Sequence, residues 1–183
     1  EALNRAWETN AESFDAIAER QKLTGMQRET VIRDKSDFAR MIAERYFRCV
    51  TEAIRAADPN HMILGCRFAG GRASEKVWRT AGTYCDILTL NYYGNVDPDR
   101  GVALSHGRLA AACPLPEAFA EFQRMGGRPL MVTEWSFPAL DSGLPCTKGA
   151  GQRFHTQKQR AAATDIFART MLGIPAVVGF NYF

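Results

Sequence analysis

Residues 129–137, Pro-Leu-Met-Val-Thr-Glu-Trp-Ser-Phe, place a carboxylate at the end of an apolar run. The run is typical of a buried strand, and Glu134 follows it directly, with Trp135 next. Parallel α/β barrels build their active sites from residues at the carboxyl ends of strands. Glu134 is therefore a candidate for the nucleophile of a retaining glycosidase. The alternative is a glutamate that caps the strand and pairs with a neighbouring arginine.

Retaining hydrolysis needs a second carboxyl about 5–5.5 Å from the first, acting as general acid and base. Asp86 begins its predicted strand, at the wrong end, and Asp97 and Asp99 lie in a predicted loop. Asp141 also lies in a loop, where carboxylates commonly form turns, although it could reach the site. We therefore expect the second carboxylate to be missing from this chain.

Polar and aromatic residues also mark the ends of the other predicted strands. These ends read Cys-Arg-Phe at 66–68, Asn-Tyr-Tyr at 91–93 and Asn-Tyr-Phe at 181–183. Aromatic rings stack on the apolar faces of sugars, and polar groups bind the hydroxyls. We expect substrate contacts from strand ends and from the long loop 137–154, although core packing competes for each aromatic and Lys148 could equally be a solvated charge. The expected contacts are Arg67, Asn91, Trp135, Asp141, Lys148 and His155.

Strands and helices alternate along the chain. The patterns predict strands at 62–68, 86–93, 130–134 and 176–183, and helices at 36–58, 74–80, 116–125 and 156–172. Such alternation is typical of βα units in an α/β fold. Four units make half of a (β/α)8 TIM barrel, which takes about 250 residues. We expect residues 1–183 to be a piece of a larger barrel, truncated at both ends.

Composition argues against several other functions. The net charge of +3 is scattered, without a basic run interleaved with aromatics, so we expect no nucleic-acid partner. The apolar runs are too short to cross a bilayer, so we expect no membrane partner. The five cysteines lack metal-binding spacing, and Gly149-Ala150-Gly151 does not match a phosphate-binding loop. We expect neither a metal nor an organic cofactor.

Four segments carry a resemblance to a known family: Glu1–Thr9, Tyr46–Phe68, Thr133–Phe137, and the loop residues Asp141–Pro145 with Thr147–Gly151. The chain resembles the carboxyl-terminal half of a (β/α)8 retaining glycoside hydrolase and looks most like the β-agarase group. The resemblance implies that the strands are the fifth to eighth of the barrel. It implies that Glu134 is the nucleophile and that Tyr93 or Tyr92 donates a hydrogen bond to it. It places the acid/base glutamate, in an Asn-Glu pair, upstream of Glu1, so the chain alone should be inactive.

The same resemblance implies a substrate and a location. We expect hydrolysis of a β-linked galactan polysaccharide or oligosaccharide such as agarose, by a secreted or periplasmic protein. The missing barrel half would come from the same or another chain. Two alternatives remain: a β-galactosidase-like glycosidase of the same clan, and a non-catalytic carbohydrate-binding half-barrel.

Overall fold

A four-stranded parallel sheet forms the centre of the fold in a computed structural model that describes residues 1–19, 29–105, 112–146 and 148–182. Its strands lie in the order β1-β2-β5-β6, and every pair is parallel. Their bounds are β1 Arg67–Ala69, β2 Leu88–Asn91, β5 Leu130–Trp135 and β6 Val177–Tyr182. The expected α/β alternation is confirmed.

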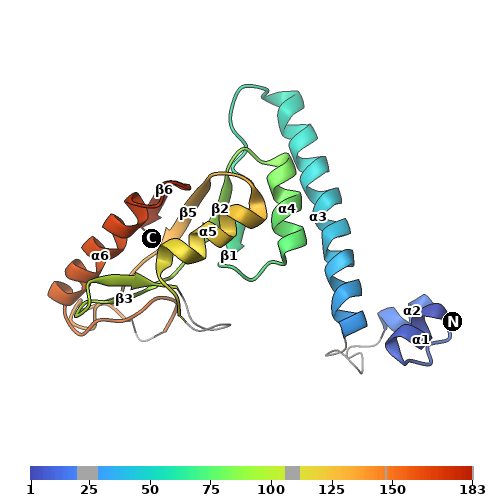
Figure 1. The fold of residues 1–183 in the computed structure, drawn as a ribbon, viewed down its shortest axis with the longest axis horizontal. Helices are drawn as coiled ribbons and strands as arrows, with labels where there is room; N and C mark the ends of the chain where they lie inside the picture. The colour runs from blue at the N-terminus through green and yellow to red at the C-terminus, as the bar shows by residue number, and fades with distance from the viewer. Residues whose placement is uncertain (20–28, 106–111, 147, 183) are drawn as a thin grey trace.

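Helices precede and connect the strands (Figure 1). They are α3 Glu29–Ala57 before β1, α4 Glu75–Tyr84, α5 Leu115–Gly126 and α6 Gln157–Leu172. Two short helices, α1 Ala2–Trp7 and α2 Phe14–Ala18, precede α3. The helix α6 begins with a capping box, in which the Thr156 hydroxyl accepts from the Gln159 amide and the Gln159 side chain accepts from Thr156.

Three features differ from the sequence prediction. The helix expected from residue 36 begins at Glu29. The strand expected at 62–68 pairs with β2 only from Arg67, because Gly65 takes a positive φ of 74° and interrupts the extended run. An antiparallel hairpin, β3 Asn95–Asp97 with β4 Val102–Leu104, was not predicted, and Phe183 lies outside the described residues.

The main core lies between the sheet and helices α4, α5 and α6. Trp78 of α4 stacks on Phe122 of α5, with ring centroids 5.4 Å apart, and also contacts Phe68 of β1. The helices α4 and α5 approach closely at Gly82, where an added Cβ would lie 1.8 Å from the Gly126 carbonyl oxygen. Only a glycine at position 82 permits this separation of the two helices.

The helix α3 packs along the outer side of α4 (Figure 1). It leaves much of its apolar surface uncovered. Five of its large apolar side chains are at least 50% exposed: Ile32, Phe38, Met41, Ile42 and Tyr46. Within the described residues, the sheet strands β1 and β6 each pair with one neighbour only. The fold therefore leaves apolar helix surface and two strand edges open to solvent.

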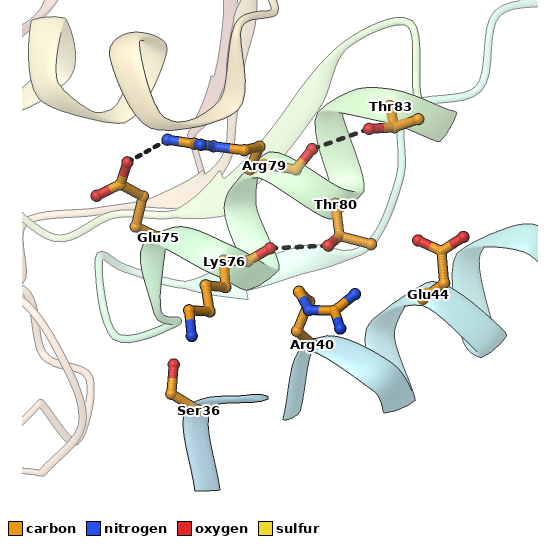
Figure 2. A pocket seen from close by; sticks show the side chains of 8 residues that line it. All are labelled: Ser36, Arg40, Glu44, Glu75, Lys76, Arg79, Thr80 and Thr83. Carbon is orange, nitrogen blue, oxygen red and sulfur yellow. Dashed lines mark hydrogen bonds and ion pairs between the residues drawn. The ribbon is translucent and has the colours of Figure 1, made fainter. Parts of the chain in front are cut away.

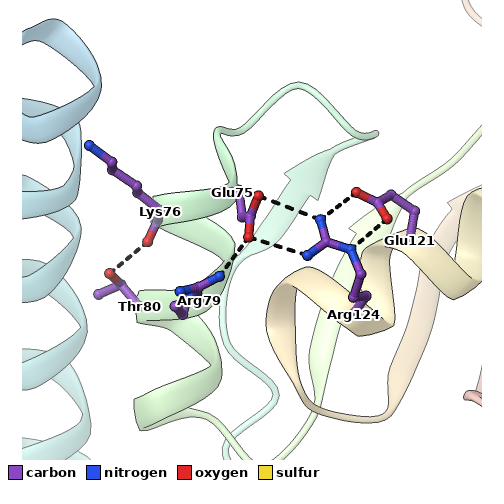
Figure 3. A network of polar contacts seen from close by, with 6 residues as sticks. All are labelled: Glu75, Lys76, Arg79, Thr80, Glu121 and Arg124. Carbon is purple, nitrogen blue, oxygen red and sulfur yellow. Dashed lines mark hydrogen bonds and ion pairs between the residues drawn. The ribbon is translucent and has the colours of Figure 1, made fainter. Parts of the chain in front are cut away.

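The groove between α3 and α4 is polar (Figure 2). Its volume is about 610 Å3, and two of its cations are paired with carboxylates, Lys76 with Asp37 and Arg79 with Glu75 at 2.6 Å. Arg124 of α5 lies between Glu75 and Glu121, which links α4 to α5 (Figure 3). Exposed pairs of this kind contribute little to stability because water screens them, so they adjust the packing of the helices rather than determine it. No described helix is both long enough and apolar enough to span a membrane.

Candidate active site

The direction of the Glu134 side chain is set by a bulge in β5. Leu90 pairs with Val132 but Asn91 pairs with Glu134, so Thr133 is an extra residue in β5. Strict alternation would place Glu134 on the helix-facing side with Leu130 and Val132. The extra residue instead brings Glu134 onto the same face as Asn91, the face away from the helices.

Three side chains from neighbouring segments converge on the Glu134 carboxylate. The Tyr93 hydroxyl donates to Oε1, while the Arg67 guanidinium of β1 and the Asn91 Nδ2 of β2 donate to Oε2, the latter at 2.9 Å. The Glu134 side chain is 21% exposed, and that of Arg67 is 50% exposed. Both carboxylate oxygens are thus held by donors while the site stays open to solvent.

Asn91 is fixed by its own neighbours. Its Oδ1 accepts from Arg67 Nε at 3.0 Å and from the Thr133 hydroxyl at 3.1 Å. Because two donors occupy the oxygen, the amide nitrogen must face Glu134. The bulge residue Thr133 therefore helps to orient the group that binds the carboxylate, a role that the sequence analysis missed.

Tyr93 is held as a hydrogen-bond donor. Burial, followed by the hydrogen bond to Glu134 and the charge of Glu134, raises the pKa of Tyr93 to about 12. Its hydroxyl therefore stays protonated through neutral and moderately alkaline pH.

Arg67 also fits the strand-capping alternative from the sequence, since it forms an ion pair with Glu134.

The structure separates the two tyrosines that the sequence left open. Tyr92 is 5% exposed, and its ring packs edge-on against Phe119 and Phe122 of α5. Tyr93, on the opposite face, brings its hydroxyl to Glu134. Adjacent residues in an extended segment face opposite sides, so only one of them joins the carboxylate.

The expected contact of Trp135 with substrate needs correction. The side chain is 3% exposed, and the centroid of its ring lies 4.6 Å from the centroid of the Phe167 ring in α6. The same bulge that brings Glu134 to the open face directs Trp135 into the helix-covered core. Trp135 is therefore a core residue in this structure and not a surface on which a sugar could stack.

The three remaining expected substrate contacts, which follow β5, lie at the surface: Asp141, Lys148 and His155. Asp141 Oδ1 accepts from the Gln157 amide at 2.8 Å, at the start of α6. The His155 amide donates to Gln159 Oε1 at 3.0 Å, and Lys148 is exposed. In the ranges that the structure describes, none of the three joins the hydrogen bonds around Glu134.

The described residues also place no other carboxylate among the groups that contact Glu134. Across the same residues, no group of three or more histidine, cysteine, aspartate or glutamate side chains could hold a metal ion. The site therefore offers one carboxylate with three donors. This arrangement can hold and orient a nucleophile, and it needs an acid from elsewhere to protonate a leaving group.

Comparisons with known proteins place the chain beside agarases. No family model matches it. It is 31% identical over 144 residues to β-agarase A from Vibrio sp. (strain JT0107), which covers 77% of this chain and 13% of that protein. It is 22% identical over 183 residues to β-agarase B from the same strain, covering 100% of this chain and 17% of that protein.

Among solved structures, the agarase AgWH50C superposes with a TM-score of 0.72 and 28% identity. That match covers 100% of this chain and 23% of AgWH50C. The chain thus spans less than a quarter of each of these three proteins. The expected resemblance is confirmed: the chain is agarase-like, and its relatives are named as β-agarases.

Proposed function

We propose that this chain supplies the nucleophile of a retaining glycoside hydrolase that acts on a β-linked galactan such as agarose. The observation that carries the proposal is the convergence of Arg67, Asn91 and Tyr93 on Glu134 at the carboxyl end of a parallel strand. The names of the relatives, β-agarase A and β-agarase B, support the choice of substrate.

In the proposed reaction, a Glu134 oxygen attacks the anomeric carbon and forms a covalent glycosyl ester as the glycosidic bond breaks. A second carboxyl, outside this chain, gives its proton to the leaving oxygen. Water then attacks the anomeric carbon of the ester, gives a proton to that second carboxylate and releases Glu134. Asn91 and Tyr93 hold the carboxylate in one orientation, which lowers the entropic cost of the attack.

We also propose that residues 1–183 form the carboxyl-terminal half of a (β/α)8 barrel, completed by the rest of the same protein or by another chain. The open edges of β1 and β6 support this proposal, because a closed barrel leaves no strand edge unpaired. The exposed apolar side chains of α3 support it too, since a preceding helix of the outer ring would cover them. The completing half would carry the acid/base carboxyl.

The test is Glu134→Gln in the full-length protein, assayed on agarose and its oligosaccharides. The variant keeps the size of the side chain but loses the nucleophile, so kcat should fall by at least about a thousandfold. Glu121→Gln, on the outer face of α5, is the matched control and should keep wild-type kcat. Proton NMR of the first product should show retention of the β configuration. Inversion, or near-normal turnover by Glu134→Gln, would contradict the proposal.

The ion pair between Arg67 and Glu134 favours one alternative, a structural carboxylate in a carbohydrate-binding domain. In that case Glu134→Gln would lower the free energy of unfolding, and the full-length protein would bind galactan without hydrolysing it. Calorimetric titration with agarose oligosaccharides, together with a hydrolysis assay on the same preparation, separates the two functions.

A further inference from the structure

We infer that Gly151, in the loop after β5, is a positioning residue that seats the ring of Tyr93 so that its hydroxyl meets Glu134. This inference rests on the proposed function of Glu134. It assigns to Gly151 alone, within a glycine-rich segment that matches no phosphate-binding motif, a role in orienting the nucleophile through Tyr93.

The Gly151 backbone approaches the site closely. Gly151 has a φ of +91°, a conformation that residues with a Cβ rarely adopt. An added Cβ would lie 2.6 Å from the Ser136 carbonyl oxygen and 3.3 Å from Tyr93 Cδ1. Any larger residue must therefore move either the backbone that follows Glu134 or the tyrosine ring.

The loop around Gly151 has little freedom to move away from Tyr93. The Arg153 guanidinium donates to three loop carbonyl oxygens, those of Cys146 at 2.6 Å, Gly149 at 3.1 Å and Gly151 at 3.4 Å. The Gln152 side chain accepts from the Val96 amide at 2.7 Å and donates to the Val96 carbonyl at 2.9 Å. The two residues that follow Gly151 in sequence, Gln152 and Arg153, thus fix its position.

Tyr93 binds a different oxygen of Glu134 from the other two donors. Its hydroxyl is the group that holds Glu134 Oε1, whereas Arg67 and Asn91 both hold Oε2. A shift of the ring by a few tenths of an ångström lengthens the hydrogen bond to one oxygen only and lets the carboxylate rotate. Small misplacements of a reacting group reduce rate strongly, so the contact at Gly151 should be visible in kcat.

The experiment is a double-mutant cycle in the full-length protein, combining Gly151→Ala with Tyr93→Phe. Gly151→Ala alone should lower kcat by about tenfold or more while KM changes by less than about threefold. In the Tyr93→Phe background, where the hydroxyl is already absent, the same change should cost less than about twofold. Equal losses in both backgrounds would overturn the inference.

Gly149→Ala is the matched control. Gly149 lies in the same loop with a φ of +101°, but an added Cβ would meet nothing within 4 Å. The control therefore reproduces the backbone strain without the contact, and it should keep kcat within about twofold of wild type. A similar loss of kcat in both alanine variants would show that loop strain, and not the contact with Tyr93, is responsible.

Arg153→Lys keeps the inference testable if Gly151→Ala does not fold. It releases the loop carbonyls without adding an atom near Tyr93, and its loss of kcat should also disappear in the Tyr93→Phe background. Persistence of that loss would overturn the inference. Glu134→Gln, measured alongside, distinguishes the two failures: activity in that variant refutes the proposed nucleophile, whereas an inactive variant with an additive cycle refutes only the role of Gly151.

Discussion

Asn91→Asp is the substitution that tests the geometry around Glu134 most directly. It keeps the shape of the side chain but replaces the Nδ2 donor, 2.9 Å from Glu134 Oε2, with an oxygen. Two carboxylates in contact cannot both stay ionised easily, so the pair should retain a proton to higher pH than either group would alone. While the proton is shared, the introduced carboxyl can still donate to Glu134.

The expected magnitude follows from the lost contact. A hydrogen bond to a charged group contributes about 1.5–3 kcal/mol, which corresponds to about 10–150-fold in rate if the contact persists in the transition state. The loss should be smallest at acidic pH, where the shared proton replaces the amide donor. It should grow as pH rises and the proton leaves, because repulsion is then added to the missing donor.

The assay is kcat against pH from 5 to 9 for the full-length protein on agarose oligosaccharides. Thr133→Val is the control, since it removes the 3.1 Å contact to Asn91 Oδ1 without altering a donor to Glu134, and it should cost less than Asn91→Asp. If Asn91→Asp keeps wild-type kcat at every pH, the reasoning that the Asn91 amide holds Glu134 is refuted.

Three further changes should have distinct effects. Tyr93→Phe should lower kcat by about tenfold or more, because it removes the donor to Glu134. Since the pKa of Tyr93 is raised to about 12, the wild type should lose no activity through ionisation of this tyrosine below pH 10. Gly82→Ala should lower the free energy of unfolding by about 3 kcal/mol or more in urea titrations, because its Cβ would overlap the Gly126 carbonyl oxygen. Phe38→Ser with Ile42→Ser should reduce self-association of the isolated chain in sedimentation experiments, since both side chains are exposed on α3.

Each of these has a clear opposing result. A fall in wild-type activity near pH 8 that is absent in Tyr93→Phe would contradict the raised pKa of Tyr93. Gly127→Ala is the control for Gly82→Ala, because its Cβ meets nothing within 4 Å despite a φ of +66°, and equal losses in the two variants would contradict the close helix contact. Unchanged sedimentation of the double serine variant would show that the apolar face of α3 does not drive association.

Much of the fold was predictable because it depends on local patterns. The alternation of apolar runs with amphipathic segments predicted the parallel sheet and its helices, and Glu134 was identified by its place after a buried run. The resemblance to agarases was also visible in short segments. The β3–β4 hairpin was missed because its strands are only three residues long and pair with each other rather than with the sheet.

The order of the elements can therefore be read from local patterns, as can the carboxylate at the strand end and the polar residues at the neighbouring ends. Which of those residues meet depends on how the strands pair and pack. The extra residue Thr133 becomes apparent only when β5 is paired with β2. That pairing places Glu134 on the face of the sheet away from the helices and Trp135 in the helix-covered core. Likewise, Tyr93 rather than Tyr92 reaches the carboxylate because packing against α5 fixes which face is covered. Periodicity is a local property of the chain, whereas register and facing depend on partners distant in sequence.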